Sequence, residues 1–401
     1  MIVNDPVFGF IEIPEGLLTQ LVKHPYVVRL TRLKQLGATH YVYPGAVHTR
    51  FQHSVGALHL VSQAVNALGE RGVCILDHER MGVEAAMLLH DLGHGPMSHV
   101  LEHCFVKGIS HEEISLHLME HINREMGGAL DIAIRIYRDS YPKHYLHELV
   151  CSQLDMDRLD YLCRDSFFTG VREGIIGVAR IIKMLDVRND QLVVEGKGIY
   201  TIENYLMARR LMYWQVYLHK TVLAAGEMLR LAIERARRLV AEGQEVECAP
   251  CLAYFLRHHV DAAFAKSHPE WISQFAALDD TDVESALKQW ATHEDFVLST
   301  LARGYTERRL LKATELEAPL TDEQLNTKRM EVAQKMGITP KEGSYFVQTR
   351  EIGQMLYSTA DDHISIIQKD GSVRDLSAFS ELLTGQHSDR TTKRYFLFSP
   401  R

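Results

Sequence analysis

One short segment, residues 87–99, is dense in side chains that bind metals or transfer protons. It reads Met-Leu-Leu-His-Asp-Leu-Gly-His-Gly-Pro-Met-Ser-His and carries His90, Asp91, His94 and His99. Imidazole and carboxylate groups are both good ligands for a divalent first-row metal. Neighbouring helical residues point about 100° apart, so His90 and Asp91 can converge on one ion placed between them. The segment predicts a metal centre. The alternative is a polar helix end with surface histidines.

The residues around this segment indicate how it is positioned. Val83, Ala86 and Met87, together with Leu88 or Leu89, form the buried side of a predicted helix over 81–91. We expect Gly93 to supply a left-handed cap, and Gly95-Pro96 forbids continuation of the helix. His90 and Asp91 are therefore expected in the last turn of a buried helix.

Two further segments carry polar residues at helical spacing. Arg50 lies one turn before His53 on a helix predicted from about residue 48 to 67. Asp157, Tyr161 and Asp165 are spaced by four on a helix predicted over 144–168, so they share one face. The alternative is a solvated charged face, but the interleaved apolar residues favour burial.

The length, composition and charge of the chain limit the classes of protein to which it can belong. Its 401 residues suggest two or three structural units, and 46% hydrophobic residues are ordinary for a globular protein with a sizeable core. A net charge of -8 argues against a general nucleic-acid-binding surface. We found no apolar run of membrane-spanning length and no signal peptide, so we expect a cytoplasmic protein without membrane contact. The six cysteines do not form a disulfide pattern, and Cys248 and Cys251 form one isolated C-x-x-C, whose default reading is coincidence.

We predict a mostly α fold with three units. Residues 1–241 form the helical core, 242–317 a helical extension, and 318–401 a small α+β unit in which apolar runs alternate with turns. Residues 1–15 read as a short extended or hairpin element, and 16–36 as a helix restarted at Pro25. Ser110 is the expected N-cap of a helix that opens at His111, and the helical stretch 249–315 is expected to break at 276–282. Residues 188–191 read as a hairpin turn, and 200–241 as one or two long helices.

Four strings in order resemble the HD-domain metal-dependent phosphohydrolases, in their deoxynucleoside triphosphate triphosphohydrolase branch. They are Lys34-Gln-Leu-Gly37, Thr49-Arg-Phe-Gln-His-Ser54, the segment from His90 to His99, and Asp155-Met-Asp-Arg-Leu-Asp-Tyr-Leu-Cys-Arg-Asp165. The resemblance covers residues 1–240 closely and 250–315 loosely. It implies an HD-domain helical core with one divalent transition metal (Fe, Mn, Zn or Ni) and magnesium accompanying the nucleotide. The implied ligands are His53, His90, Asp91 and Asp157. Two imidazoles and two carboxylates leave room on a six-coordinate ion for water and a phosphate oxygen.

The resemblance also implies roles for the remaining polar residues. The catalytic group around the phosphates would be His94, His99, His111 and Glu112, with one histidine as general acid for the leaving 5′-oxygen. Glu112 would orient His111, while Glu102 could orient His99. Substrate-binding residues would be Arg50, Arg158 and Arg209 for the phosphates, Gln35 and Leu36 for sugar and base, Tyr161 under the ribose, Asp165 at the 3′-hydroxyl and Tyr217 at C2′.

The implied activity is hydrolysis of deoxynucleoside triphosphates to deoxynucleoside and triphosphate by a homodimer or homotetramer. Two alternatives remain open: an HD phosphohydrolase for another nucleotide (mono-, diphosphate or cyclic), and a nucleotide-binding regulatory protein with weak turnover. The positions of the family's activator-binding Asp and Arg hold Lys23 and Thr31, which puts a nucleotide activator in doubt.

Overall fold

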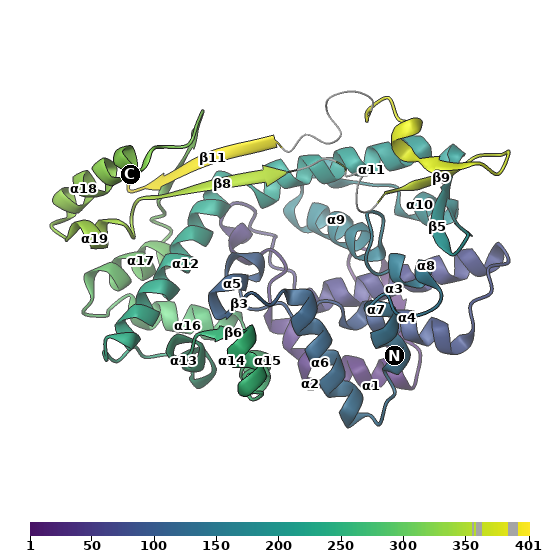
Figure 1. Ribbon diagram of the computed structural model, residues 1–401, viewed down its shortest axis with the longest axis horizontal. Helices are drawn as coiled ribbons and strands as arrows, with labels where there is room; N and C mark the ends of the chain where they lie inside the picture. Colours follow the sequence, from purple (N-terminus) through teal and green to yellow (C-terminus); the bar gives the residue numbers. More distant parts are fainter. Residues whose placement is uncertain (355–356, 358–362, 384–391) are drawn as a thin grey trace.

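The computed structural model describes residues 1–354, 357, 363–383 and 392–401, with nothing said of the side chains of His99, Gln354 and Thr392. The predicted mostly α fold is confirmed: helices dominate, and small sheets lie at the N-terminus, the middle and the C-terminal end (Figure 1). Within these residues, no helix is both long and apolar enough to cross a bilayer.

The N-terminal elements follow the predicted order. Strands β1 (Ile2–Asp5) and β2 (Gly9–Glu12) pair antiparallel and form a hairpin, one of the two forms expected for this segment. Helix α1 (Leu17–Lys23) stops before Pro25, which begins α2 (Pro25–Arg29). The 3₁₀ turns η1 (Leu30–Arg32) and η2 (Gly37–Tyr41) then lead into the core. The helix predicted over 16–36 therefore restarts at Pro25, as expected, but ends several residues early.

Helices α3 (Arg50–Glu70), α4 (Asp77–Leu89), α7 (Asp131–Tyr137) and α9 (Met156–Thr169) pack together around the centre of the core. Thr49 and Gln52 cap α3, with the Thr49 amide donating to Gln52 Oε1 at 2.8 Å. Helix α4 ends at Leu89, so His90 is its cap and Asp91 follows it. The prediction that Gly93 adopts a left-handed conformation was wrong. Gly93 is required because a Cβ there would lie 1.9 Å from the His111 carbonyl oxygen.

The loop after α4 leads to η3 (Ser98–Val100), α5 (Glu102–Phe105) and strand β3 (Val106–Lys107). Helix α6 (His111–Glu125) follows, and Ser110 is its N-cap as predicted, accepting from the Glu113 amide.

The single helix predicted over 144–168 is instead two, α8 (His144–Glu148) and α9. The break has a local cause: the Asp155 carboxylate accepts from the Ser152 amide at 2.9 Å and from the Arg158 amide at 2.7 Å. Asp155 thus caps α9, as short polar side chains commonly do. As a result, Asp157 lies in the first turn of α9.

The segment after α9 contains η4 (Arg172–Gly174), α10 (Val178–Met184) and the predicted hairpin of β4 (Leu185–Arg188) and β5 (Gln191–Glu195). After η5 (Gly196–Gly198), the region 200–241 forms two helices, α11 (Ile199–Met212) and α12 (Lys220–Ala241). They are joined by the π-helical turn η6 (Tyr213–Tyr217).

The helical extension contains α13 (Pro250–Arg257), strand β6 (Val260–Asp261), α14 (Ala262–Ser267), α15 (Trp271–Ala277), α16 (Asp280–Trp290) and α17 (Phe296–Thr306). The predicted break near residue 278 is confirmed between α15 and α16. Strand β6 pairs parallel with β3, so the extension and the core share this short sheet.

The C-terminal region is α+β, as predicted, but its sheet also contains a strand at residues 312–316, before the predicted boundary at 318. Strands β7 (Lys312–Leu316), β8 (Gln348–Gln354) and β11 (Thr392–Ser399) form an antiparallel sheet, with α18 (Asp322–Met336) and α19 (Pro340–Gly343) at one end (Figure 1). A second sheet has the order β10-β9-β5-β4, where β9 (Ser365–Ile367) and β10 (Val373–Asp375) precede η7 (Leu376–Ala378). This sheet joins the C-terminal unit to the core, since β9 pairs with β5.

Candidate active site

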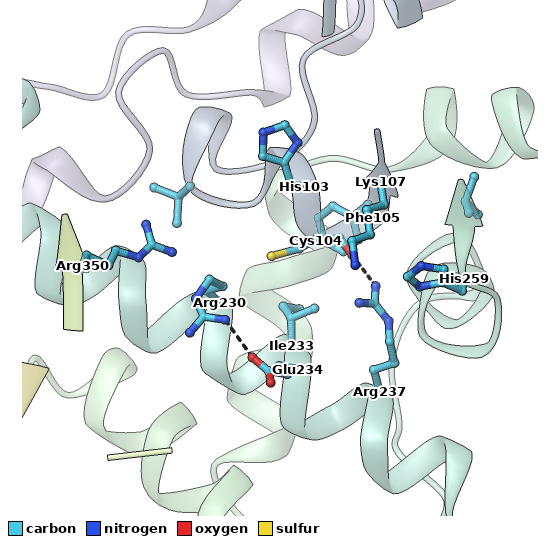
Figure 2. Close-up of a pocket in the computed structure, with 12 residues that line it drawn as sticks. His103, Cys104, Phe105, Lys107, Arg230, Ile233, Glu234, Arg237, His259 and Arg350 are labelled. Carbon is cyan, nitrogen blue, oxygen red and sulfur yellow. Dashed lines mark hydrogen bonds and ion pairs between the residues drawn. The ribbon is translucent and has the colours of Figure 1, made fainter. Parts of the chain in front are cut away.

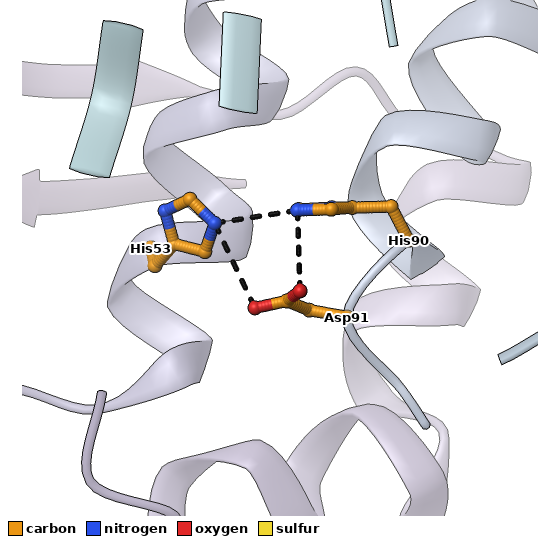
Figure 3. Close-up of side chains that lie close together, drawn as sticks. All are labelled: His53, His90 and Asp91. Atoms are coloured by element: carbon orange, nitrogen blue, oxygen red, sulfur yellow. Dashed lines mark hydrogen bonds and ion pairs between the residues drawn. The ribbon is translucent and has the colours of Figure 1, made fainter. Parts of the chain in front are cut away.

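Two imidazoles from different helices face each other in the buried centre of the core. Nε2 of His53, from α3, lies 3.3 Å from Nε2 of His90, at the end of α4 (Figure 3). The opposite nitrogen of each ring has a fixed partner: His53 Nδ1 contacts Asp160 Oδ2 at 2.6 Å, and His90 Nδ1 contacts the Met87 carbonyl at 2.6 Å. With Nδ1 as the donor, both Nε2 lone pairs point at the same place, which suits a bound cation.

Two carboxylates complete this group. Asp91 Oδ1 lies 3.4 Å from His90 Nε2, and Asp91 Oδ2 lies 3.7 Å from His53 Nε2. Asp157 Oδ1, from the first turn of α9, lies 3.0 Å from His53 Nε2 and 3.4 Å from His90 Nε2. The structure therefore brings all four predicted metal ligands together, and three of them, His53, His90 and Asp91, form a buried cluster of metal-ligating type. Two nitrogens and two carboxylates fit a divalent first-row metal.

The electrostatics of the cluster favour a cation. Burial opposes protonation of His53, but its hydrogen bonds to Asp157 and Asp160 outweigh burial and raise the pKa to about 10. Burial also opposes ionisation of Asp91, yet the neighbouring Arg50 holds its pKa well below the usual range. Because ligands bind in deprotonated form, a metal here competes with the proton on His53 Nε2.

The partner of His53 is itself held by a chain of buried ion pairs that the sequence had not revealed. Arg164 donates two hydrogen bonds to Asp160, both at 2.9 Å, and one to Asp5 of β1 at 2.6 Å. The Asp160–Arg164 ion pair lies against the backbone of α3. A Cβ at Gly56 would lie 2.0 Å from atoms of both Asp160 and Arg164. Asp160 follows Asp157 by three residues in the same string, and this spacing was the sequence signal that could have identified Asp160 as part of the site.

Two more predicted catalytic residues stack beside the cluster. The rings of His94 and His111 lie 4.1 Å apart and nearly parallel, and His94 Nε2 is 3.3 Å from Asp91 Oδ1. Burial, and to a smaller extent the positive charge of Arg50, hold the pKa of His94 well below its ordinary value, which favours the neutral ring.

His111 has carboxylates on both sides. Its Nδ1 lies 2.5 Å from Glu102 Oε1, and its Nε2 lies 3.2 Å from Glu112 Oε1. Burial opposes its charge, but the hydrogen bond with Glu102 outweighs burial and raises the pKa. Glu102, expected beside His99, therefore holds His111; the side chain of His99 lies outside the described part of the chain.

The predicted sugar- and base-facing residues are tied to the loop that follows the His-Asp pair. The Ser98 hydroxyl contacts the Lys34 and Gln35 carbonyls at 3.0 and 3.1 Å. Asp280, at the start of α16, accepts from the amides of Lys34 at 2.8 Å and Met97 at 2.7 Å. Burial raises the pKa of Asp280 to about 6. Gln35 and the adjacent Leu36 are thus held near the loop that follows the His-Asp pair. Asp280 sets this position, and the sequence did not reveal its role.

The three predicted phosphate-binding arginines have different partners. Arg50 donates to Asp91 Oδ2 at 2.5 Å and to Ser98 Oγ at 3.2 Å, so it contacts a candidate metal ligand directly. Arg158 Nε donates to the Ser152 carbonyl at 2.7 Å, and Arg209 Nη1 donates to Gln153 Oε1 at 2.9 Å. Both guanidinium groups therefore attach to the loop before α9. Within the described residues, the terminal nitrogens of Arg158 have no hydrogen-bond partner, so they are available to a ligand.

The predicted sugar contacts lie together along α9. Tyr217, from η6, donates its hydroxyl to Asp165 Oδ2 at 2.7 Å, and its ring is 6.3 Å from that of Tyr161. His48, which was not predicted, contacts Asp165 Oδ1 at 2.7 Å and stacks on Phe168. The structure thus brings Tyr161, Asp165 and Tyr217 together as one group.

Known proteins resemble this chain over its whole length. Residues 176–247 match the HD associated region family. An uncharacterised protein of Bacillus subtilis is 29% identical to this chain, and the match covers 97% of this chain and 90% of the Bacillus protein. The deoxynucleoside triphosphate triphosphohydrolase SAMHD1 of Homo sapiens is 29% identical over 55% of this chain, which covers 42% of the human protein.

The similarity to a solved structure is closer. A phosphohydrolase from Bacteroides thetaiotaomicron is 51% identical, with a TM-score of 0.96 and full coverage of both chains. That identity over complete chains, together with the HD associated region and the buried His-His-Asp cluster, places this protein in a family: the chain belongs to the HD-type phosphohydrolases.

Proposed function

We propose that the chain hydrolyses deoxynucleoside triphosphates to deoxynucleoside and triphosphate. The observation that carries this proposal is one face of α9. The candidate metal ligand Asp157 is followed one turn later by Tyr161 and two turns later by Asp165, which is bonded to Tyr217. Eight helical residues span about 12 Å. This distance suits a substrate whose phosphate lies at the metal and whose sugar lies near Asp165.

The arrangement of the basic residues favours a substrate with a chain of phosphates over a substrate with a single phosphate. Arg158 and Arg209 attach to the same loop from two helices, and Arg50 lies against Asp91. A guanidinium binds phosphate oxygens through a planar fork of N–H donors. The terminal N–H groups of Arg158 supply such donors one residue after Asp157. The relatedness to SAMHD1 proteins, which are named triphosphohydrolases, points the same way.

The chain's own residues would divide the chemical work. A metal held by His53, His90, Asp91 and Asp157 would polarise the attacked phosphoryl group and acidify water. His111, kept protonated by Glu102, would donate the proton to the leaving 5′-oxygen. His94, in its neutral form, would stack on His111 and hold it over the phosphate. Tyr217 and Asp165 would bind the sugar.

Product analysis tests the proposal. Purified protein loaded with manganese or iron is incubated with dGTP, dATP, dGDP, dGMP and a cyclic nucleotide, each with and without chelator. The proposal predicts chelator-sensitive release of intact inorganic triphosphate and deoxynucleoside from the triphosphates only. Release of single phosphates, or turnover of the mono- or cyclic nucleotides instead, would assign a different phosphohydrolase activity. Binding of a nucleotide without turnover would assign a regulatory role.

A further inference from the structure

A basic pocket lies apart from the candidate metal centre, between α5, α12, the β3–β6 pair and β8. Its volume is about 380 Å³, inside the roughly 300–1,000 Å³ range of small-molecule sites. Figure 2 shows the side chains of Arg230, Arg237 and Arg350 at this pocket, together with Lys107 and His259. His103, Cys104 and Phe105 of α5 line another wall.

The positive charge of the pocket is only partly neutralised. Arg230 pairs with Glu227 at 2.6 Å and Glu234 at 2.7 Å, and Arg350 pairs with Glu227 at 2.7 Å. Four cationic side chains thus meet two carboxylates, which leaves an excess of two positive charges.

The excess charge belongs to Arg237 and Lys107. Arg237 donates to the backbone carbonyls of Cys104 and Phe255 and has no carboxylate partner among the described residues. Lys107 is exposed and likewise has no ion-pair partner there. Among the described residues these two cations have no ion-pair partner, and two such cations in one pocket indicate an anionic ligand.

The spacing of the cations indicates an extended anion. Arg230 and Arg237 are seven residues apart on α12, so they lie on nearly the same face and about 10 Å apart along the helix axis. Arg350 enters from β8 and Lys107 from β3, on other sides of the pocket. A single phosphate or carboxylate could reach only part of this arrangement, whereas a chain of phosphates could contact several of its cations.

We propose that this pocket is a second ligand site, which binds an oligophosphate group, either free or as part of a nucleotide. The site is linked to the candidate catalytic residues through the four-residue helix α5. Its first residue, Glu102, holds His111, and the next three line the pocket. Binding at the pocket requires no turnover, so it can be tested separately from the proposed reaction.

The test is a calorimetric titration of the full chain with inorganic triphosphate. An Arg158→Ala/Arg209→Ala background removes phosphate contacts of the candidate active site, and we expect one triphosphate to bind per chain. Adding Lys107→Glu should weaken binding at least tenfold, because a charged hydrogen bond is lost and a repulsive charge is gained. The matched control is Lys266→Glu on α14, an exposed lysine that does not line the pocket, and it should leave the affinity unchanged within about twofold.

The same titration of the protein with an intact active site keeps the test decisive if the background variant does not fold. It should show two triphosphates per chain, and Lys107→Glu should reduce this number to one. Absence of binding in a folded background variant, or equal weakening by both lysine substitutions, would overturn the proposal. A non-hydrolysable deoxynucleoside triphosphate distinguishes the ligand source: tighter binding than inorganic triphosphate assigns a nucleotide, and weaker binding assigns the free oligophosphate.

Discussion

Asp160 accepts a hydrogen bond from Nδ1 of His53 at 2.6 Å, and both side chains are fully buried. The carboxylate fixes the tautomer of the ring, which leaves Nε2 as the nitrogen that faces His90. Partners of this kind orient metal-binding histidines and raise their basicity. Asp160 is therefore as much a part of the candidate metal site as the residues that would touch the ion.

The first prediction concerns this positioning residue. Asp160→Asn keeps the shape of the side chain but removes its charge, so we expect metal affinity to fall about 10- to 100-fold. Metal titration monitored by calorimetry measures the change. Asp322→Asn, at an exposed position on α18, is the control and should bind metal normally. An Asp160→Asn protein with unchanged affinity would assign Asp160 to the Arg164 ion pair alone.

The second prediction concerns the ligands. Elemental analysis should find about one divalent first-row metal per chain. His90→Ala or Asp157→Ala should empty the site and abolish turnover. Full metal content and activity in an Asp157→Ala protein would remove that residue from the ligand set.

The third prediction concerns pH. The pKa of His111 is raised, since its hydrogen bond with Glu102 outweighs burial. Its protonated form therefore persists above the usual value of about 6.5, and activity should be lost as the pH rises through this raised pKa. Glu102→Gln should move the alkaline limb of the kcat profile to lower pH. Glu120→Gln, further along α6, should leave the profile in place. If neither variant moves it, His111 is not the proton donor.

The fourth prediction concerns the phosphates. Arg209→Ala should weaken triphosphate binding by roughly 1.5–3 kcal/mol, the usual range for a charged hydrogen bond, and monophosphate binding by less. Arg210→Ala provides a matched control on the same helix, because neighbouring helical residues point about 100° apart. An equal loss for both nucleotides would place Arg209 in a purely structural contact with Gln153.

The fifth prediction concerns the sugar. In the proposed binding mode Tyr217 would stand against C2′ and leave no room for a 2′-hydroxyl, which should cost a ribonucleotide roughly 1–3 kcal/mol, or about tenfold to a hundredfold in kcat/KM. Tyr217→Ala should narrow this gap, mainly by improving turnover of the ribonucleotide. The control is Tyr213→Ala, which removes a ring 5.1 Å from that of Tyr217 and should leave the ratio of the two kcat/KM values unchanged. An unchanged ratio in Tyr217→Ala would make Tyr217 a structural aromatic, and a ratio near one in the unaltered protein would reject deoxynucleotide preference.

Sequence patterns were informative where one local rule decides the structure. The Ser110 cap, the restart at Pro25 and the turn at residues 188–191 each depend on a few adjacent residues, and all are present. The resemblance to the HD-domain family, carried by four strings in order, predicted that His53, His90, Asp91 and Asp157 converge.

Contacts between distant segments were not predictable in this way. Nothing local to Gly93 reveals that the backbone of α6 lies against it. The Asp160–Arg164–Asp5 chain and the Asp280 contacts join segments far apart in the sequence. For the same reason, the basic pocket could not be seen from any single stretch of the chain.

The pairing of β5 with β9 has a consequence for shortened forms of the protein. Strand β5 lies inside a four-stranded sheet only because β9 supplies its outer neighbour. A chain cut at residue 318 would leave β5 as an open edge, with Val193 and Val194 on it and unpaired backbone groups facing solvent. Exposed apolar edges of this kind template intermolecular strand addition. The shortened chain should therefore self-associate through β5, which size-exclusion chromatography would detect as oligomers.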